Sequence, residues 1–333
     1  MSEDIRYGVV GCAGIAPLHG AAVQQTDGAT LVGAADIVAE NAEEFAAEWG
    51  GTAYTDTTEM IESEDVDAVS VCTPSGTHAE VAVEAIEAGA HVLCEKPLDV
   101  YLDRIDAMIE RADEHDKQLA SVFQRRTFRE HQRAKRAIED GDLGDLVMGD
   151  TVAKFWRDQD YYDSADWRGT RAMDGGALMN QAIHFVDLLQ WLMGGVESVY
   201  AYTDTLTWDM EMEDVAAVAL TFENGAVGTM EASTTVRGSG TGVEINGTSG
   251  TYDHGEFRLE EGDIEAPEDD HSWGDGHVRV VEDFVTALRE GTEPMVPARE
   301  GRKAVEVILA AYASANLGRE VRIDELDMLR EHT

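Results

Sequence analysis

Cysteine, long apolar runs and basic residues are all scarce in this chain of 333 residues. The three cysteines, Cys12, Cys72 and Cys94, form no CxxC pair, so we expect small buried side chains and neither a disulfide nor a metal site. No run of about 18 uncharged apolar residues occurs, which excludes a membrane-spanning helix. The opening MSEDIRYGVVGC has acids where a secretory signal has bases, so we expect a cytoplasmic protein.

The shortage of bases is the strongest compositional feature. The chain has 25 Lys and Arg against 67 Asp and Glu, a net charge of −42, and only five of the bases are lysines. Such a surface repels nucleic acids and anionic membranes, so we expect neither as a partner. The acids are spread along the whole chain, which is typical of a highly soluble protein. The composition is also similar to that of proteins from halophilic archaea, in which concentrated salt screens the repulsion.

The pattern of apolar segments predicts two domains. Over residues 1–123, short strand-like segments alternate with helix-like ones, which indicates an α/β domain with a doubly wound, parallel Rossmann sheet. After Phe123, a further helix and strand lead into strands that follow one another without helices between them, and Asn224-Gly225 is a strong hairpin signal. Residues 124–333 are therefore predicted to form an α+β domain with an open, largely antiparallel sheet.

The segment GVVGCAG follows the first predicted strand and opens a helix, the context of a dinucleotide-binding fingerprint. Backbone N–H groups and the helix N-terminus would meet a pyrophosphate there. Aligned as G-x-G-x-x-A, the positions are Gly11, Ala13 and Ala16. Alanine thus replaces the middle glycine, and the neighbouring Gly14 offers room for the phosphates.

Asp36 ends the second predicted strand, 22 residues after Gly14. A carboxylate there binds the ribose hydroxyls of adenosine and repels a 2′-phosphate. This favours NAD over NADP, although NADP stays possible. Alternatively, Asp36 caps the helix that follows.

CEKPLDV follows the strand-like HVLC, which places Glu95 and Lys96 at the carboxyl edge of the parallel sheet, where open α/β folds bind ligands. Lys96 is the only lysine among the first 116 residues. A solvated surface lysine fits this position poorly. We therefore interpret Lys96 as a functional residue.

The segment GGALMNQAIHFVDLLQW, residues 175–191, reads as an apolar helix interrupted by polar residues. Asn180, His184 and Asp187 are spaced by four and three residues, so they can share one face of an α-helix. The plain alternative is a core histidine with satisfied hydrogen bonds.

Three segments, GVVGCAGIA, CTPSGTHAEVAVEAIEAGAHVLCEKPL and GGALMNQAIHFVDLLQWLMG, together resemble the Gfo/Idh/MocA family of oxidoreductases. The resemblance implies an NAD(P)-binding Rossmann domain and an α+β domain whose sheet builds homodimers or homotetramers. It implies oxidation of a hydroxyl of a sugar, sugar derivative or cyclitol by hydride transfer. The cofactor-binding residues predicted on this basis are Gly11, Ala13, Gly14, Ile15, Asp36, Thr73, Pro74, His78, Glu95 and Lys96.

The resemblance assigns catalysis to Lys96 and His184. A histidine suits acceptance of the hydroxyl proton, and a lysine cation would stabilise the developing alkoxide. A lysine with a lowered pKa could be the base instead, so the two roles stay open. Many family members have Asp at the position of Asn180, which we expect to orient the substrate or His184.

The loop over residues 156–173 is rich in aromatic and arginine side chains, which suit recognition of pyranose rings and carboxylates, although ordinary loop packing is the alternative. The predicted substrate-binding residues are Arg126, Trp156, Arg157, Tyr161, Trp167, Arg168, Asn180 and Gln181. Two rival functions stay open: a glycoside hydrolase of the same fold that retains NAD, and a non-enzymatic sensor, against which intact Lys96 and His184 argue.

Overall fold

A computed structural model describes residues 4–237, 240–260, 262, 264 and 273–332. The chain divides into two compact units: unit 1 holds Met1–Thr127 and His271–Arg302, and unit 2 holds Phe128–Asp270 and Lys303–Thr333. The boundary expected after residue 123 differs from this division. Helix α9 (Trp273–Glu290) belongs to unit 1 because it packs against α1 (Ala16–Gln25) and the short helix η2 (Gln124–Thr127).

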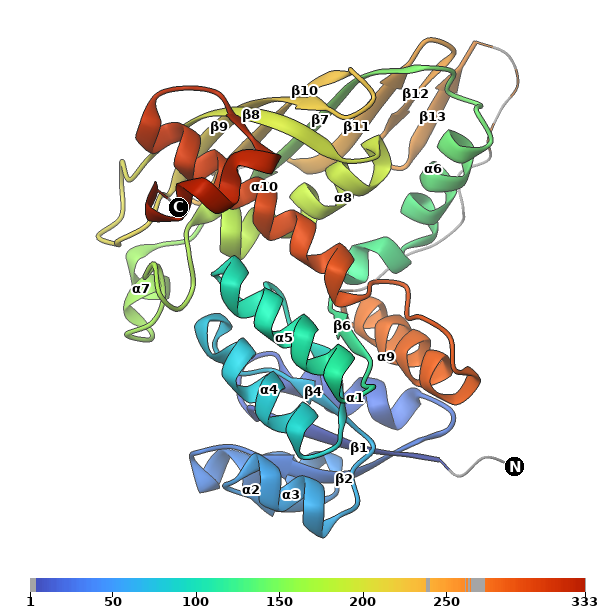
Figure 1. Ribbon diagram of the computed structural model, residues 1–333, viewed down its shortest axis with the longest axis vertical. Coiled ribbons are helices and arrows are strands. Elements are labelled where there is room, and N and C mark those ends of the chain that lie inside the picture. Colours follow the sequence, from blue (N-terminus) through green and yellow to red (C-terminus); the bar gives the residue numbers. More distant parts are fainter. Residues whose placement is uncertain (1–3, 238–239, 261, 263, 265–272, 333) are drawn as a thin grey trace. The chain divides into compact units, whose positions relative to one another are not determined.

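Unit 1 is built on a six-stranded sheet in the order β3-β2-β1-β4-β5-β6, and every pair of strands is parallel. The strands are β1 (Ile5–Val10), β2 (Ala29–Ala35), β3 (Thr52–Tyr54), β4 (Ala68–Val71), β5 (His91–Cys94) and β6 (Leu119–Ser121). The remaining helices of this unit are α2 (Ala39–Trp49), α3 (Thr57–Ser63), η1 (Ser75–Thr77), α4 (His78–Glu87) and α5 (Leu102–Glu114). The predicted doubly wound parallel sheet is confirmed (Figure 1).

The helices of unit 1 form two groups. Helix α1 contacts α2 and α9, whereas α4 contacts α3 and α5, as expected for helices on both faces of a doubly wound sheet. Strands β1, β4 and β5 are almost wholly buried between them. Strand β3 and helix α3 had no counterpart in the sequence prediction, because a three-residue, half-exposed strand has too short a pattern to detect.

Unit 2 contains an eight-stranded sheet in the order β13-β12-β11-β7-β10-β9-β8-β14. Among the described strands of this sheet, only β7 and β10 pair in parallel. The strands are β7 (Leu146–Lys154), β8 (Val196–Asp204), β9 (Val215–Phe222), β10 (Val227–Ser233), β11 (Thr241–Gly247), β12 (Gly250–Asp253), β13 (Glu256–Leu259) and β14 (Val321–Arg322). The largely antiparallel sheet is confirmed. The predicted hairpin joins β9 to β10, and Gly225 adopts a φ of +85° in its turn.

The helices of unit 2 are α6 (Arg129–Glu139), α7 (Gln159–Asp163), the π-helix η3 (Ala177–Ala182), α8 (Ile183–Met193), α10 (Ala298–Leu317), whose first turn is counted with unit 1, and η4 (Ile323–His332). Helix α8 packs against β7 and β11 and is buried along almost its whole length. The sheet therefore fixes α8, the helix that carries His184.

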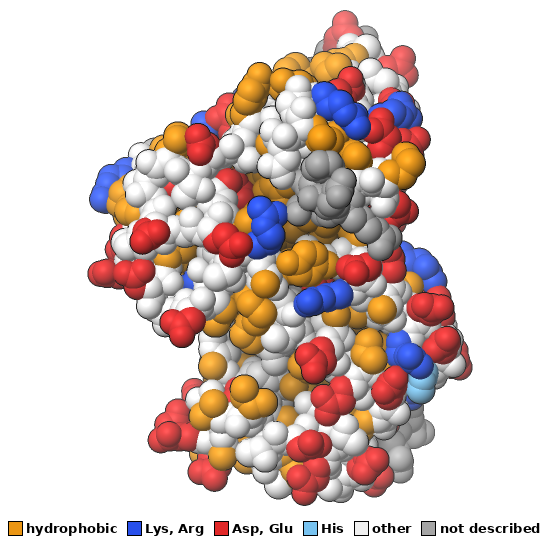
Figure 2. Space-filling view, turned by 60° about the vertical axis from the view of Figure 1, so that its left-hand side comes forward, with side chains coloured by type: hydrophobic (Ala, Val, Ile, Leu, Met, Phe, Trp, Pro, Cys, Tyr) orange, Lys and Arg blue, Asp and Glu red, His pale blue; other side chains and the backbone are white. Residues whose placement is uncertain are grey.

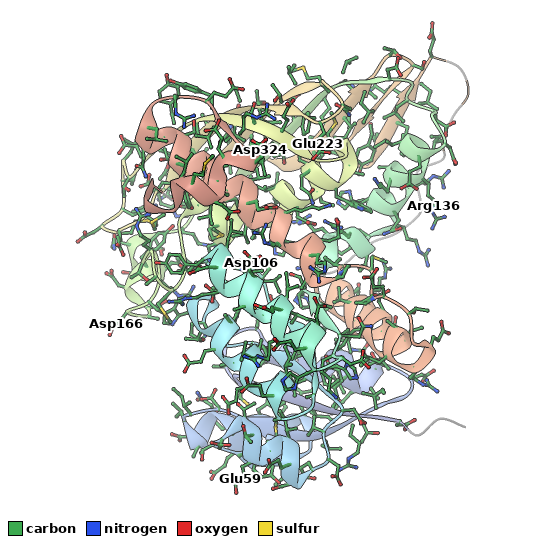
Figure 3. All side chains as sticks on the ribbon, in the orientation of Figure 1. Glu59, Asp106, Arg136, Asp166, Glu223 and Asp324 are labelled. Carbon is green, nitrogen blue, oxygen red and sulfur yellow. The ribbon has the colours of Figure 1, made fainter. Side chains whose placement is uncertain are left out.

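Acidic side chains recur across the face shown in Figure 2, where basic ones are few. The acids labelled in Figure 3 come from separate elements: Glu59 from α3, Asp106 from α5, Asp166 from the loop after α7, Glu223 from the β9–β10 turn and Asp324 from η4. The negative charge is thus distributed over both units. Within the described ranges, no helix combines the length and apolar character needed to cross a membrane.

Candidate functional site

The glycine-rich loop lies at the carboxyl ends of β1 and β4. Gly11 has a φ of +84°, and a Cβ there would lie 2.7 Å from the backbone nitrogen of Thr73, so no other residue fits both restraints. Ala13 and Gly14 are exposed just before α1. Apart from its neighbours in the chain, no atom of the described residues lies within 4 Å of the place of a Cβ at Gly14, so the loop is open at this position.

Asp36, at the end of β2, is tied to this loop. Its Oδ2 accepts the N–H of Cys12 over 2.8 Å, and its Oδ1 accepts the N–H of Val38 over 2.8 Å. The carboxylate therefore holds the turn before α2 and lies beside the fingerprint, as a ribose-binding group requires. It does not cap α2, because the N-cap is Val38 and no side chain caps that helix.

An exposed apolar residue follows Asp36. The side chain of Ile37 is 93% exposed at the carboxyl edge of β2, where the adenosine end of a dinucleotide would lie in a doubly wound fold. The exposed loop, the carboxylate and this apolar side chain fit an NAD molecule. Sequence reasoning missed Ile37, although an isoleucine directly after the strand-ending acid was a usable signal.

Glu95 is the centre of a buried hydrogen-bond network in unit 1. Its Oε1 lies 2.9 Å from Nε2 of His19 and 3.4 Å from Nε2 of His277. Burial by itself would raise the pKa of Glu95, but the hydrogen bonds from His19 and His277 outweigh it and hold that pKa well below its usual range. Glu95 is therefore a buried anion.

The other carboxylate oxygen of Glu95 accepts the backbone N–H of Lys96 over 3.1 Å. Glu95 thus holds the backbone at Lys96 from inside the unit, and its carboxylate does not point toward solvent. The side chain of Lys96 is partly exposed. The sequence analysis predicted Glu95 as a cofactor contact. It missed His19 and His277, which hold the carboxylate of Glu95, because they lie on α1 and α9, far from Glu95 in the chain.

In unit 2, the helix predicted over residues 175–191 is regular only in its second half. Residues 177–182 form the π-helix η3, and the α-helix begins at Ile183. The expectation of one α-helix that carries both Asn180 and His184 is therefore wrong, because Asn180 lies on the π-helix and His184 on the α-helix. His184 and Asp187 do lie on one α-helix three residues apart, and both are buried.

Asn180 and Gln181 connect a row of polar side chains in unit 2. The amide of Asn180 donates to Asp174, the amide of Gln181 donates to Asn180, and Nη2 of Arg157 donates to Oε1 of Gln181 over 2.7 Å. The Oδ2 of Asp174 accepts the N–H of Gly169 over 2.8 Å. This row, from Arg157 to Asp174, joins the predicted substrate loop to the π-helix. Asp174 was not predicted, and the DGG sequence that precedes the helix gave its only signal.

Tyr161 packs beside this row. The guanidinium of Arg168 lies 4.4 Å and that of Arg157 lies 5.1 Å from the centre of its ring, which is a cation–π arrangement. The amide of Gln181 donates to its hydroxyl over 3.3 Å. Arg168 also lies 4.6 Å from the ring of Trp167. The structure therefore brings Arg157, Tyr161, Trp167, Arg168 and Gln181 together.

Two predicted substrate residues contact other side chains of the protein. Trp156 lies edge-on to Trp208, and the guanidinium of Arg237 covers its ring at 3.4 Å. Arg126, in unit 1, is 1% exposed, and its Nη1 lies 3.5 Å from Glu300. A buried guanidinium with a carboxylate partner offers little to a substrate, so Arg126 is not retained in the candidate site.

The first turn of the π-helix is hydrogen-bonded to Glu213, a buried acid that the sequence analysis did not identify. Its backbone carbonyl accepts the N–H of Ala177, and its Oε1 accepts the N–H of Leu178 over 2.8 Å and the hydroxyl of Tyr312 over 3.1 Å. Burial raises the pKa of Glu213 to about 7. Glu213 therefore anchors the segment that carries Asn180 and Gln181.

Comparison with known proteins identifies the class of protein. The model for the NAD-binding Rossmann fold of an oxidoreductase family matches residues 5–123, and the model for the C-terminal α/β domain of the same family matches residues 135–323. The protein is an oxidoreductase that uses NAD, as the sequence predicted. The chain belongs to the Gfo/Idh/MocA family.

Two of the similar proteins match nearly the whole chain, and a third matches just over half of it. The WlbA dehydrogenase from Bordetella pertussis, solved with NADH and UDP-GlcNAcA, is 34% identical, with a TM-score of 0.86 over 96% of this chain and 99% of that one. The myo-inositol 2-dehydrogenase of Thermotoga maritima is 28% identical over 97% of this chain and 99% of its own. A 2,7-anhydro-N-acetylneuraminate hydratase from Mediterraneibacter gnavus is 30% identical over 58% of this chain and 50% of its own.

Proposed function

We propose that the protein is an NAD-dependent dehydrogenase that oxidises a hydroxyl of a sugar, sugar derivative or cyclitol. The observation that carries the proposal is the polar row from Arg157 through Gln181 and Asn180 to Asp174, on the segment that leads directly into the helix of His184. Its amides and guanidinium offer several directed hydrogen bonds, which is what a ligand covered with hydroxyl groups needs.

In this proposal, Lys96 and His184 act on the same hydroxyl. NAD, when bound, would supply the acceptor for the hydride from the carbon that carries that hydroxyl. His184 takes the hydroxyl proton, and Lys96 as a cation stabilises the alkoxide while the C–H bond breaks. Asn180 orients the substrate through its amide. Gly11, Gly14, Ile15 and Asp36 hold the cofactor at the exposed loop before α1.

We propose a sugar acid linked to a nucleotide as the first substrate to test. The relative solved with NADH and UDP-GlcNAcA shares 34% identity, more than the inositol dehydrogenase does. Arg157 and Arg168 flank Tyr161 with two guanidinium groups, and guanidinium forks bind carboxylates in a bidentate manner. A uronate group would therefore find charged partners in unit 2, whereas a neutral cyclitol would use only hydrogen bonds.

The test is a panel of UDP-linked uronates, free sugars and cyclitols with NAD and NADP at molar salt, followed by the absorbance of the reduced nicotinamide. The proposal expects net NADH formation with one substrate class. Substrate consumption with NAD retained and no net NADH would favour the NAD-retaining hydrolytic alternative. Binding without turnover of any kind would favour the sensor.

We also propose a homodimer or homotetramer formed through the eight-stranded sheet. The face of the sheet opposite α8 exposes apolar side chains on separate strands: Met148 is 41% exposed on β7, Val227 52% on β10 and Tyr202 69% on β8. Light scattering at molar salt tests the proposal. A monomeric mass, or an oligomer that Val227→Asp does not weaken, would contradict it.

A further inference from the structure

His78 makes two contacts that one neutral histidine cannot satisfy. It begins α4, its side chain is 1% exposed, and all of its partners belong to unit 1. Its Nδ1 lies 2.6 Å from the carbonyl oxygen of Pro97, and its Nε2 lies 2.7 Å from the carbonyl oxygen of Thr73. A carbonyl oxygen only accepts hydrogen bonds, whereas a neutral imidazole has one N–H and one lone pair. Both contacts are hydrogen bonds only if the ring carries two protons.

The two carbonyls belong to the loops that carry the predicted cofactor and catalytic residues. Thr73 follows β4 and borders Gly11, and Pro97 directly follows Lys96 after β5. Strands β4 and β5 are neighbours, with Val71 paired to Cys94. The ring of His78 therefore bridges the ends of two adjacent strands. Glu95 holds the backbone at the N–H of Lys96, and His78 holds it at the carbonyl of Pro97, the next residue.

The charges around His78 act in opposite directions. Burial holds the pKa of His78 below its usual range, because it outweighs the hydrogen bonds to Pro97 and Thr73 and the charge of Glu95, which raise the pKa; Lys96 lowers it further. Asp99, whose carboxylate is 3.4 Å from the N–H of Ala79, has its own pKa raised to about 6 by burial, and Arg104 lies 3.9 Å from it. On the side of β4, burial raises the pKa of the Cys72 thiol, which stays uncharged.

Although burial opposes the charged ring, the two contacts require it. A neutral ring would direct a lone pair at one carbonyl oxygen within 2.7 Å, and two lone pairs at hydrogen-bond distance repel. The buried anion Glu95 supplies the compensating negative charge that a buried cation needs. The arrangement as it stands is therefore that of an imidazolium.

We propose that His78 is a positioning residue that works as a buried imidazolium, joining Thr73 to Pro97 and thereby holding Lys96 in place for catalysis. When the ring loses its second proton, it can no longer donate to both carbonyls. The segment of Lys96 then loses one of the two hydrogen bonds described above. The inference rests on the proposed function in one respect, since it takes Lys96 to act on the substrate.

The protonation of His78 can be tested without reference to activity. In protein labelled with ¹⁵N at histidine, with the His78 signals assigned through His78→Gln and His78→Asn, both ring nitrogens are expected to carry a proton at mildly acidic pH, below the lowered pKa of His78. His91 is the internal control, because its Nδ1 accepts the N–H of Gln118 over 2.9 Å and must lack a proton in that arrangement. A nitrogen of His78 that stays unprotonated at mildly acidic pH in the folded, active protein would overturn the proposal.

Activity gives the second readout. Neither His78→Gln nor His78→Asn can donate to both carbonyls from two opposed nitrogens, so we expect turnover to fall about tenfold or more. Wild-type turnover should decline as the pH rises through the pKa of His78, well below the pH of about 10 at which a lysine loses its proton. Both variants should lack that decline, and a decline that persists in them would contradict the proposal. Full activity of Lys96→Ala would instead refute the proposed function and leave the protonation result intact.

Discussion

The carboxylate of Asp36 accepts the backbone N–H of Cys12 over 2.8 Å, which fixes the end of β2 to the glycine-rich loop after β1. The two strands are neighbours in the sheet, with Val10 paired to Ala35. Because the loop and the carboxylate are joined, the negative charge lies at a fixed position beside the fingerprint. A 2′-phosphate on the adenosine ribose would meet that charge.

We therefore predict that kcat/KM is higher with NAD than with NADP, and that Asp36→Asn reduces this preference by about tenfold or more. Asparagine keeps an oxygen that can accept the N–H of Cys12, so the change removes charge while retaining the link to the loop. Glu40→Gln, at an exposed acid in the first turn of α2, is the matched control. A wild-type preference for NADP would contradict the prediction.

The sequence was informative where one local pattern decides the structure. The alternation of strands and helices identified the doubly wound sheet, and Asn224-Gly225 identified the β9–β10 hairpin because that turn demands a positive φ. The glycine-rich loop needed only its context after β1. Motifs of this kind depend on neighbouring residues, so no long-range information was required.

Features that depend on distant segments could not be read from the sequence. The π-helix at Asn180 starts on Glu213, and the carboxylate of Glu95 is held by His19 and His277. An i→i+5 turn and an i→i+4 turn have the same local composition, so only the tertiary partner distinguishes them. For the same reason, the burial of Arg126 against Glu300 was not apparent.

The proposed mechanism predicts that Lys96→Ala and His184→Ala each lower turnover by at least about a hundredfold, the low end for a positioned acid–base group. His184→Ala should keep NAD binding largely intact, because the cofactor loop lies in unit 1 and His184 lies in unit 2. Lys117→Ala, at a lysine beyond the end of α5, serves as the control. Near wild-type turnover in either catalytic variant would remove the mechanism.

The hydrogen bond between Asn180 and Asp174 can be tested by exchanging the amide and the carboxylate between the two positions. Asn180→Asp would place two carboxylates at hydrogen-bond distance, where both cannot stay ionised at neutral pH without repulsion. We expect turnover to fall about tenfold or more and to recover partly as the pH is lowered. The double variant Asp174→Asn/Asn180→Asp restores one amide and one carboxylate and should regain activity. A double variant no better than Asn180→Asp would mean that the order of the pair matters for the substrate itself.

The raised pKa of Glu213 predicts that the stability of the folded protein depends on pH. Burial raises its pKa to about 7 in the folded protein, whereas an unfolded glutamate titrates near about 4.3. Below both values the acid is protonated in both states and costs nothing. As the pH rises between them the unfolded state loses its proton first, so the folded state becomes less stable, by about 4 kcal/mol at most once both pKa values are passed.

Glu213→Gln keeps an acceptor for the N–H of Leu178 and the hydroxyl of Tyr312 but removes this titration. The variant should melt at a higher temperature than the wild type at about pH 8, and the difference should shrink toward about pH 5. Glu223→Gln, in the exposed β9–β10 turn, is the control and should show little change. A difference between wild type and Glu213→Gln that is the same at every pH would exclude the linkage.

The final prediction concerns salt. The 67 acids, against 25 Lys and Arg, are distributed over both units, so mutual repulsion at low ionic strength opposes the compact state. Salt shortens the range of that repulsion, from about 10 Å at 0.1 M to about 3 Å at 1 M, and cations gathered at the folded surface would bind the native state preferentially. Melting temperature and activity should therefore both rise between those concentrations of KCl.

Sucrose at matched concentration favours burial without screening charge, so it should stabilise the protein much less. If sucrose stabilises the protein as well as KCl does, exclusion from the protein surface accounts for the effect and the charge argument is wrong.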